Sequence, residues 1–196
     1  MNIEVIIFII ISYFLGSISS AVITCRLLNL PDPRTQGSNN PGATNVLRIG
    51  GKKAAIITLS GDFLKGFVPV ILAKFLSVNS QGLCLIALSV FLGHLYPIFF
   101  RFQGGKGVAT SFGCIVAISW PVGAALLATW LLIAKVFRVS SVAALVAAVA
   151  APIYTYFLTN KAFAITVLIM SIFLVYRHKK NIKQIIYGKE QKIKSK

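Results

Sequence analysis

Long apolar stretches alternate with short polar segments along the whole chain. They occupy residues 3–24, 54–78, 82–100, 108–136, 139–158 and 162–176. Most of them are close to the roughly 20 residues that a helix needs to cross the hydrocarbon core of a bilayer. Hydrophobic residues make up 57% of the chain and charged residues only 12%, whereas a soluble domain has roughly 25% charged residues. The pattern predicts an all-α integral membrane protein that crosses the bilayer several times.

The positions of the charges predict the orientation of these helices. The sequence has 20 Lys and Arg against 4 Asp and Glu, which gives a net charge of +16. Most basic residues fall in four clusters, at 26–53, 101–106, 135–138 and 177–196, and the turns between these clusters are poor in charge. Because Lys and Arg gather on the cytoplasmic side of membrane proteins, each cluster is expected inside and each charge-poor turn outside. The N-terminus is then outside and the C-terminus is cytoplasmic.

This topology requires seven transmembrane helices in a single polytopic membrane domain, residues 1–196. The expected spans are 3–24, 54–76, 82–100, 107–119, 121–137, 140–158 and 162–177, followed by a basic cytoplasmic tail, 178–196. The stretch 108–136 must then cross twice, with a break near Trp120 and Pro121, because a proline can end a helix. A single kinked helix there, and hence six spans in all, is the alternative.

Composition also excludes several kinds of site. Binding of nucleic acid needs an extended basic soluble face, which so apolar a chain does not offer. Cys25, Cys84 and Cys114 have neither metal-ligand spacing nor a pairing pattern, and are expected to be small buried hydrophobes. With only 4 acidic residues, the chain has no paired carboxylates for a metal centre, and it lacks a Gly-x-Ser-x-Gly nucleophile motif. We therefore expect no metal, no cofactor and no nucleic-acid partner.

The first polar segment, RTQGSNNPGATNVLRIGG at 34–51, has a composition suited to binding an anion. Its glycines let the backbone approach a ligand, and consecutive backbone N–H groups bind anions. Arg48 adds a guanidinium that suits phosphate. A flexible surface loop has a similar composition, but residues 36–47 contain no Lys or Glu, which a solvated loop normally has. We favour the anion site.

A second polar segment, RFQGGKGVATSFG at 101–113, places Lys106 among glycines directly before an expected span. A helix N-terminus attracts anions through its unpaired N–H groups and its dipole, so this lysine resembles a phosphate clamp. The segment is not a P-loop, because Phe100 occupies the position of the first glycine in that motif. An ordinary cytoplasmic lysine in a tight turn is the alternative.

Further polar residues stand within or beside the apolar stretches. Asp62 and Lys65 are three residues apart, so they can pair on one helix face; charges inside a span usually pair or face a polar cavity. A structural ion pair and a direct role in a site both remain open for them. His94 is expected to make a hydrogen bond between helices. Ser141, like its neighbour Ser140, can cap a helix or bind phosphate.

The last basic segment contains His178 and Asn181, three residues apart and therefore on one side if the helix continues. His178 is a candidate general base or phosphate donor, and a solvated histidine beside the membrane is the alternative. The polar groups thus gather at one membrane surface. They suit a substrate that carries a phosphate at one end and a lipid at the other.

Taken in order, these motifs resemble those of one family, the bacterial membrane acyl-phosphate:glycerol-3-phosphate acyltransferases. The similarity covers almost the whole chain and runs through GSISSA at 16–21, GSNNPGATNVLR at 37–48, GDFLKG at 61–66, GHLYP at 93–97, GGKGVATSFG at 104–113 and YRHKKNI at 176–182. A single Gly-Gly-Lys-Gly would not be specific, whereas the ordered set is. The resemblance implies seven helices and an external N-terminus, in agreement with the charge pattern.

The resemblance implies transfer of a fatty acyl group from acyl phosphate to the 1-hydroxyl of glycerol 3-phosphate. This gives lysophosphatidic acid and phosphate, the first step of phospholipid synthesis, at the cytoplasmic face of the bacterial inner membrane. The residues implied to bind glycerol 3-phosphate are Ser38, Arg48, Lys106, Ser140, His178 and Asn181. Those implied near acyl phosphate are Asn40, Gly42, Thr44, Asn45, Gly104, Gly105 and Gly107. All of the first set except Ser140 are implied to act in catalysis.

Further expectations concern the shape of the first loop, the course of the reaction and the surroundings of the protein. The chain has Asn39 where the family commonly has a glycine; asparagine tolerates a positive φ better than most residues, so the loop shape is expected to survive. The acyl donor is already activated, so we expect direct attack by the glycerol hydroxyl, without an acyl-enzyme, assisted by the substrate's own phosphate. A transporter of organophosphates is the alternative, although it would place polar groups near the bilayer midplane. We expect the protein to lie in membrane lipid, and the sequence is compatible with a monomer.

Overall fold

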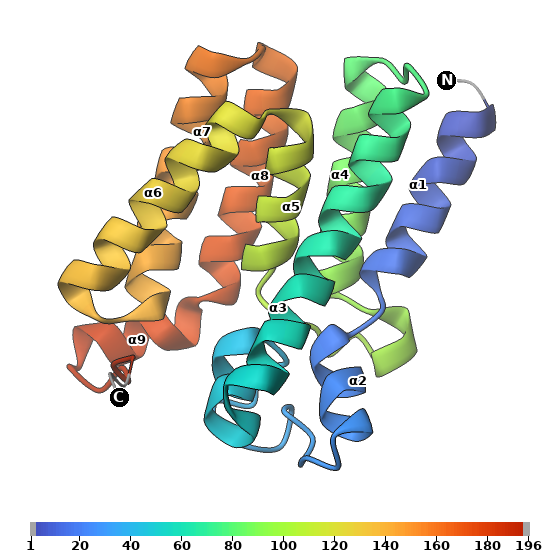
Figure 1. Cartoon of the computed structure of the whole chain (residues 1–196). Coiled ribbons are helices and arrows are strands. Elements are labelled where there is room, and N and C mark those ends of the chain that lie inside the picture. The colour runs from blue at the N-terminus through green and yellow to red at the C-terminus, as the bar shows by residue number, and fades with distance from the viewer. Residues whose placement is uncertain (1–2, 194–196) are drawn as a thin grey trace. The chain divides into compact units, whose positions relative to one another are not determined.

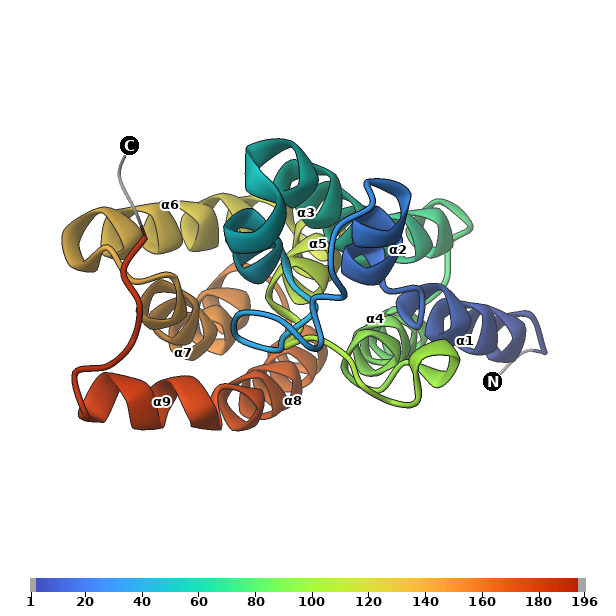
Figure 2. The same ribbon diagram turned by 90° about the horizontal axis from the view of Figure 1, so that it is seen from below.

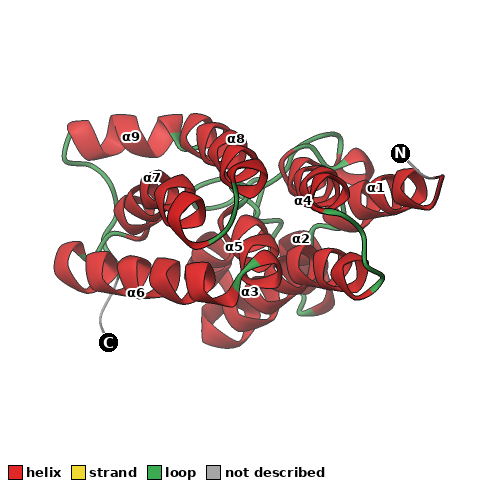
Figure 3. Ribbon diagram, turned by 90° about the horizontal axis from the view of Figure 1, so that it is seen from above, coloured by secondary structure: helices red, strands yellow, loops and turns green. Residues whose placement is uncertain are grey.

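The computed structural model describes residues 3–193, and these residues fold into α-helices joined by short connections (Figures 1 and 3). The chain consists of two compact units, Met1–Ile118 and Ser119–Lys196. The first unit contains α1 (Ile3–Gly16), α2 (Ser20–Leu27), α3 (Ala43–Phe75), α4 (Ser80–Leu95), the 3-10 turn η1 (Ile98–Phe100) and α5 (Val108–Ile118). The second contains α6 (Trp120–Phe137), α7 (Ser140–Leu158), α8 (Lys161–Arg177) and α9 (Lys179–Ile186).

Glycines allow the helices of the first unit to pack closely, as Figure 1 shows for α3 beside α5 and α1 beside α4. A Cβ at Gly66 of α3 would overlap with the Thr110 carbonyl of α5, and a Cβ at Gly113 of α5 would overlap with the Phe63 carbonyl. Gly16 of α1 lies in the same way against the backbone of α4. Without the driving force of water, membrane helices associate through such close backbone contacts at small residues.

The membrane-crossing segments match the prediction only in part. Four helices are long and apolar enough to cross a bilayer alone, and six candidates result if the bent pairs α1–α2 (43°) and α8–α9 (58°) each count as one span. The apolar helix α5 has only 11 residues and is too short to count as a candidate span. This accounts for the difference between these six candidates and the seven spans predicted. The chain leaves helical geometry at Ser119, immediately before Trp120, so the predicted break in 108–136 is confirmed.

Several helix ends differ from the predicted spans. The first span, 3–24, is two helices, because the chain breaks between Gly16 and Ser20. The third, 82–100, ends as an α-helix at Leu95 and continues as η1, since Pro97 cannot donate a backbone hydrogen bond to the preceding turn.

The polar segment 34–51 is not a loop throughout, because α3 already begins at Ala43. Gly51 has φ 73° and ψ −172°, a conformation that breaks α3 into two helical parts. The first part is amphipathic: Val46 is fully buried against Ala21 and Cys25 of α2, and Ile49 packs against the same cluster. This apolar contact explains why a segment rich in turn-forming residues becomes helical.

The second unit packs α7 against both α6 and α8. In its C-terminal segment, residues 179–186 form α9, so the chain is again helical beyond α8, as the sequence allowed. The chain then turns back: Lys189 N donates to Gln184 O at 2.7 Å, and Ile193 N donates to Arg138 O at 2.6 Å. The part of the predicted tail beyond residue 193 lies outside the described residues.

Candidate active site

The residues that precede α3 form an ordered loop, residues 33–42, which we call the asparagine loop. Asn45, 1% exposed on the first turn of α3, holds it together. Asn45 Oδ1 accepts a hydrogen bond from Ser38 N at 2.9 Å, and Asn45 Nδ2 donates to Pro33 O and to Gln36 O, each at 2.9 Å. The side chain of Asn45 therefore fixes the backbone beside Ser38, whereas the Ser38 residue itself is exposed.

Two residues of the asparagine loop have left-handed backbone conformations. Gly37 has φ 62°, and a Cβ there would overlap with Asn45 Oδ1. Asn39 has φ 57°, a conformation that asparagine adopts more readily than most residues. Asn39 therefore occupies a position at which a glycine would be equally suitable, as expected from the sequence.

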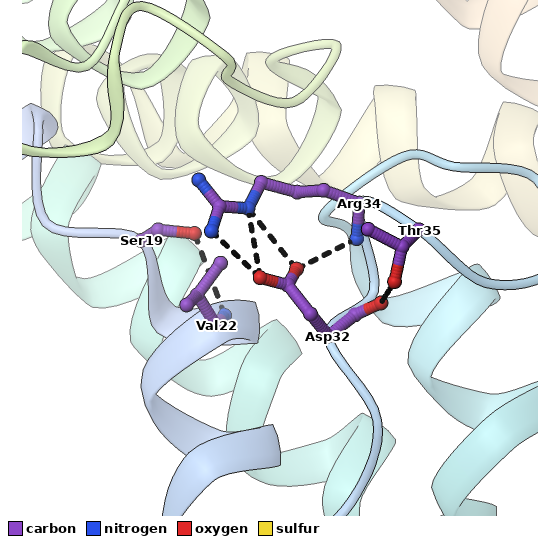
Figure 4. A network of polar contacts seen from close by, with 5 residues as sticks. All are labelled: Ser19, Val22, Asp32, Arg34 and Thr35. Atoms are coloured by element: carbon purple, nitrogen blue, oxygen red, sulfur yellow. Dashed lines mark hydrogen bonds and ion pairs between the residues drawn. The ribbon is translucent and has the colours of Figure 1, made fainter.

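The two arginines of the segment 34–51 differ in their surroundings. Arg34 is bound to Asp32: its Nη2 lies 2.6 Å from Oδ2, and its Nε donates to both carboxylate oxygens at 3.0 and 3.1 Å (Figure 4). The side-chain hydrogen bond from Arg34 lowers the pKa of Asp32, and the same bond raises the pKa of Arg34. The guanidinium also lies 5.8 Å from the centre of the Phe100 ring. Arg34 thus binds Asp32 at the start of the loop, whereas Arg48 is exposed on α3.

The second polar segment forms a turn, residues 104–107, which we call the glycine turn. Gly104, Gly105 and Gly107 are buried and Lys106 is half-buried. Gly105 N donates to His94 O at 3.2 Å. Gly107 has φ 88°, and a Cβ there would overlap with the Phe91 ring. Only glycine suits this backbone.

The asparagine loop and the glycine turn meet at one point of the first unit, as the view from below shows (Figure 2). A Cβ built on Gly105 would lie 3.3 Å from Pro41 O. Pro41 precedes the start of α3 at Ala43 by two residues, and Gly105 precedes the start of α5 at Val108 by three. Two helix N-termini therefore begin beside this contact, and both carry partial positive charge. The arrangement suits a bound phosphate.

A buried charged cluster lies on α3 and α4 of the same unit. Lys65 Nζ is 2.9 Å from Asp62 Oδ1, and His94 Nδ1 is 3.6 Å from the same oxygen. Asp62 and Lys65 form the ion pair that was one of the two interpretations left open by the sequence, and His94 of α4 approaches α3 at the same carboxylate oxygen. Because 3.6 Å is too long for a hydrogen bond, the hydrogen bond expected of His94 stays a prediction. Sequence reasoning missed that the three side chains form one cluster, because their spacing along the chain contains no signal for it.

The second unit holds the remaining predicted residues near the junction of α8 and α9. His178 is 2% exposed, and its Nδ1 lies 2.8 Å from Leu174 O. With the proton on Nδ1, the neutral ring has its lone pair on Nε2. Asn181 Nδ2 donates to Glu190 Oε1 at 2.7 Å. Ser140 is half-buried at the first position of α7.

Glu190 is a polar residue of this unit that sequence reasoning missed. Its Oε1 accepts from Asn181 and also from Ser141 Oγ, each at 2.7 Å. Glu190 thus joins α7 to α9. No pattern in the lysine-rich segment around it indicates this contact. Among the described residues, no three His, Cys, Asp or Glu side chains gather as a metal site.

Comparison with known proteins agrees over nearly the whole chain. A family model described as glycerol-3-phosphate acyltransferase matches residues 6–188. Glycerol-3-phosphate acyltransferases of Ruthia magnifica and Methylococcus capsulatus are 50% and 52% identical to this chain, over 96% and 94% of both sequences respectively.

Two crystal structures are also similar, both of PlsY (YgiH), an integral membrane glycerol 3-phosphate acyltransferase. Its glycerol 3-phosphate form has a TM-score of 0.92 at 35% identity, and its lysophosphatidic acid form has a TM-score of 0.90 at 34% identity. Each comparison covers 96% of this chain and 95% of the other. The protein is therefore a multi-pass integral membrane protein, and it belongs to the glycerol-3-phosphate acyltransferase family.

Proposed function

We propose that the protein transfers a fatty acyl group from acyl phosphate to the 1-hydroxyl of glycerol 3-phosphate. The products are lysophosphatidic acid and inorganic phosphate. Membership of the family supplies the acyltransferase activity and the acceptor. The contact of Pro41 with Gly105 supports binding of a phosphate group, because two helix N-termini begin beside it. The choice of acyl phosphate as the donor rests on the resemblance of the motifs to the family named above.

The substrates are assigned to residues by motif position. Glycerol 3-phosphate is held by Ser38, Arg48, Lys106, Ser140, His178 and Asn181, and acyl phosphate by Asn40, Gly42, Thr44, Asn45, Gly104, Gly105 and Gly107. Asn45 acts mainly through the loop, since its side chain is already bonded to three backbone groups. Ser38 and Arg48 are exposed and can reach a substrate.

The reaction follows from the chemistry of the donor. The 1-hydroxyl oxygen attacks the acyl carbonyl carbon, the bond from that carbon to the bridging oxygen breaks, and phosphate leaves with that oxygen. Backbone N–H groups of the glycine turn and the ammonium of Lys106 stabilise the negative charge that develops on the departing phosphate. Holding both substrates in line supplies much of the remaining rate enhancement.

The hydroxyl proton passes to the substrate's own phosphate, so that no acyl-enzyme and no metal is required. His178 binds glycerol 3-phosphate in this account. The site lies on the cytoplasmic face of a bacterial inner membrane, because the basic clusters gather on that side. Seven spans complete this topology if α5 crosses the membrane as a short helix.

The purified protein tests the proposal directly. Given glycerol 3-phosphate, it should release phosphate and form lysophosphatidic acid with palmitoyl phosphate as the donor, and it should form little with palmitoyl-CoA. Turnover with palmitoyl-CoA alone would refute the choice of donor. Uptake of glycerol 3-phosphate into proteoliposomes, without any acyl transfer, would instead indicate a transporter.

A further inference from the structure

We propose that His94 is a positioning residue for acyl transfer: its imidazole transmits the fixed position of Asp62 to the glycine turn. The inference rests on the proposed function, in which that turn binds acyl phosphate. His94 lies at the end of α4, between the buried carboxylate of Asp62 and the backbone of Gly105. Its role is to keep the N–H groups of the turn and Lys106 aligned with the donor.

The first side of His94 faces the glycine turn. Its carbonyl accepts the hydrogen bond from Gly105 N at 3.2 Å. Its ring packs so closely on Gly105 that a Cβ there would overlap with Nε2 and lie 2.8 Å from Cε1. The carbonyl of Pro41 lies on Gly105 as well. Moving the imidazole therefore moves the point at which the glycine turn meets the asparagine loop.

The other side of His94 faces a charge that the fold holds in place. Asp62 is 4% exposed and Lys65 is 8% exposed at the side chain, and the two form an ion pair at 2.9 Å. Lys65 Nζ also donates to Ile18 O at 2.8 Å, which ties the pair to the break between α1 and α2. Thr110 Oγ1 donates to Asp62 O at 3.0 Å. The glycine turn is thus attached to α3 at two points, through His94 before it and through Thr110 after it.

Energetics explain why this cluster is suited to positioning. Burying a carboxylate and an ammonium is costly, and such a pair adds little stability over apolar residues of the same size. Its partners are nevertheless held to a narrow range of positions, because separating them leaves a charge without compensation in a medium of low polarity. A displacement of the imidazole that shifts the turn by about 1 Å is expected to lower kcat/KM by up to about a hundredfold.

Two single substitutions separate the two sides of the ring. Gln places its terminal amide near the position of Nε2, against Gly105, whereas Asn places its amide near Nδ1, against Asp62. We expect H94Q to retain more activity than H94N. The main effect should be a raised KM for acyl phosphate with a smaller change in the KM for glycerol 3-phosphate. A merely structural role would instead lower the amount of folded enzyme and leave both KM values unchanged.

A double-mutant cycle tests the contact itself. G105A adds a methyl group against the ring, and H94A removes the ring, so the loss of kcat/KM in the double variant should be smaller than the product of the single losses. G104A is the matched control, because a Cβ on Gly104 would overlap with the backbone carbonyls of His94 and Leu95, which H94A does not remove. That pair should be additive. Additive behaviour of both pairs would overturn the proposal.

Further controls keep the outcomes distinct. Y154F removes a hydroxyl that lies 3.1 Å from Thr129 Oγ1 in the second unit, and it should leave the kinetics unchanged. If H94A or H94N does not fold, the variants G105A and G105S supply the comparison, because each adds a side chain against the ring of His94. Wild-type KM values for acyl phosphate in both variants would overturn the proposal. If the wild type uses only acyl-CoA, the proposed function fails, but the same cycle run with acyl-CoA still decides the role of His94.

Discussion

Asn45→Ala should open the asparagine loop without unfolding the protein. The substitution removes the side chain that bonds Ser38 N, Pro33 O and Gln36 O. Each intramolecular hydrogen bond contributes about 1 kcal/mol net, so three of them hold the loop closed by about 3 kcal/mol. Since about 1.4 kcal/mol corresponds to a factor of ten, the equilibrium for local opening should rise by roughly a hundredfold.

Limited proteolysis measures this opening directly. Trypsin can cleave after Arg34 only when the loop leaves its closed form, so the rate of that cleavage should rise with the opening equilibrium. The KM for glycerol 3-phosphate should rise in parallel, because Ser38 loses its fixed backbone. Asn79→Ala is the matched control: the Asn79 side chain accepts one hydrogen bond, from Gly82 N at the start of α4. It should lower the Tm slightly and leave cleavage after Arg34 unchanged. An N45A protein with the wild-type cleavage rate and KM would refute the reasoning.

Three further substitutions give separate tests. The hydrogen bond from Arg34 lowers the pKa of Asp32 in the folded state. The stabilising contribution of Asp32 is therefore present above its unfolded pKa of about 3.9 and is lost as the pH falls through the lower folded value. The Tm of D32N should accordingly depend less on pH below about 4 than the Tm of the wild type. Glu190→Ala removes the acceptor of Asn181 and should lower kcat/KM for glycerol 3-phosphate by about tenfold, measured by steady-state kinetics, with E190Q intermediate and an unchanged value contradicting the assignment. His178→Ala should raise the KM for glycerol 3-phosphate and retain a measurable kcat at saturating substrate in steady-state kinetics. Complete loss of kcat at an unchanged KM would make His178 the general base.

The all-helical membrane class could be predicted from the sequence, because the thickness of the bilayer acts directly on local composition. The number and ends of the spans agree only in part, since α1–α2 and α8–α9 are bent pairs and α5 is short. The break before Trp120 was predictable because a proline acts on its own neighbours in the chain. The ion pair of Asp62 with Lys65 was one of two alternatives, because their spacing allows a contact on one helix face. Helix 43–50 was not predictable. Its stability comes from Val46 packing on Ala21 and Cys25 of α2, a contact with a distant segment that the turn-forming pattern around Val46 does not indicate.

The candidate site shows the same division. The motifs identified the segments of the first unit, and the structure brings two of them together at Pro41 and Gly105. Sequence alone could not assign Arg34 to Asp32 rather than to a substrate. It also missed His94 as the third member of the Asp62 cluster and Glu190 as the partner of Asn181, because these contacts depend on tertiary packing.

One measurement tests the central claim, that acyl transfer from acyl phosphate to glycerol 3-phosphate breaks the bond between the carbonyl carbon and the bridging oxygen. Acyl phosphate labelled with ¹⁸O in its bridging oxygen is given to the purified enzyme with glycerol 3-phosphate, and the ¹⁸O content of each product is measured by mass spectrometry. Attack at the carbonyl carbon predicts that the label leaves with phosphate and that unlabelled lysophosphatidic acid forms in an equal amount. Label retained in a free fatty acid, with a second phosphate transferred to glycerol 3-phosphate instead of an acyl group, would contradict the account.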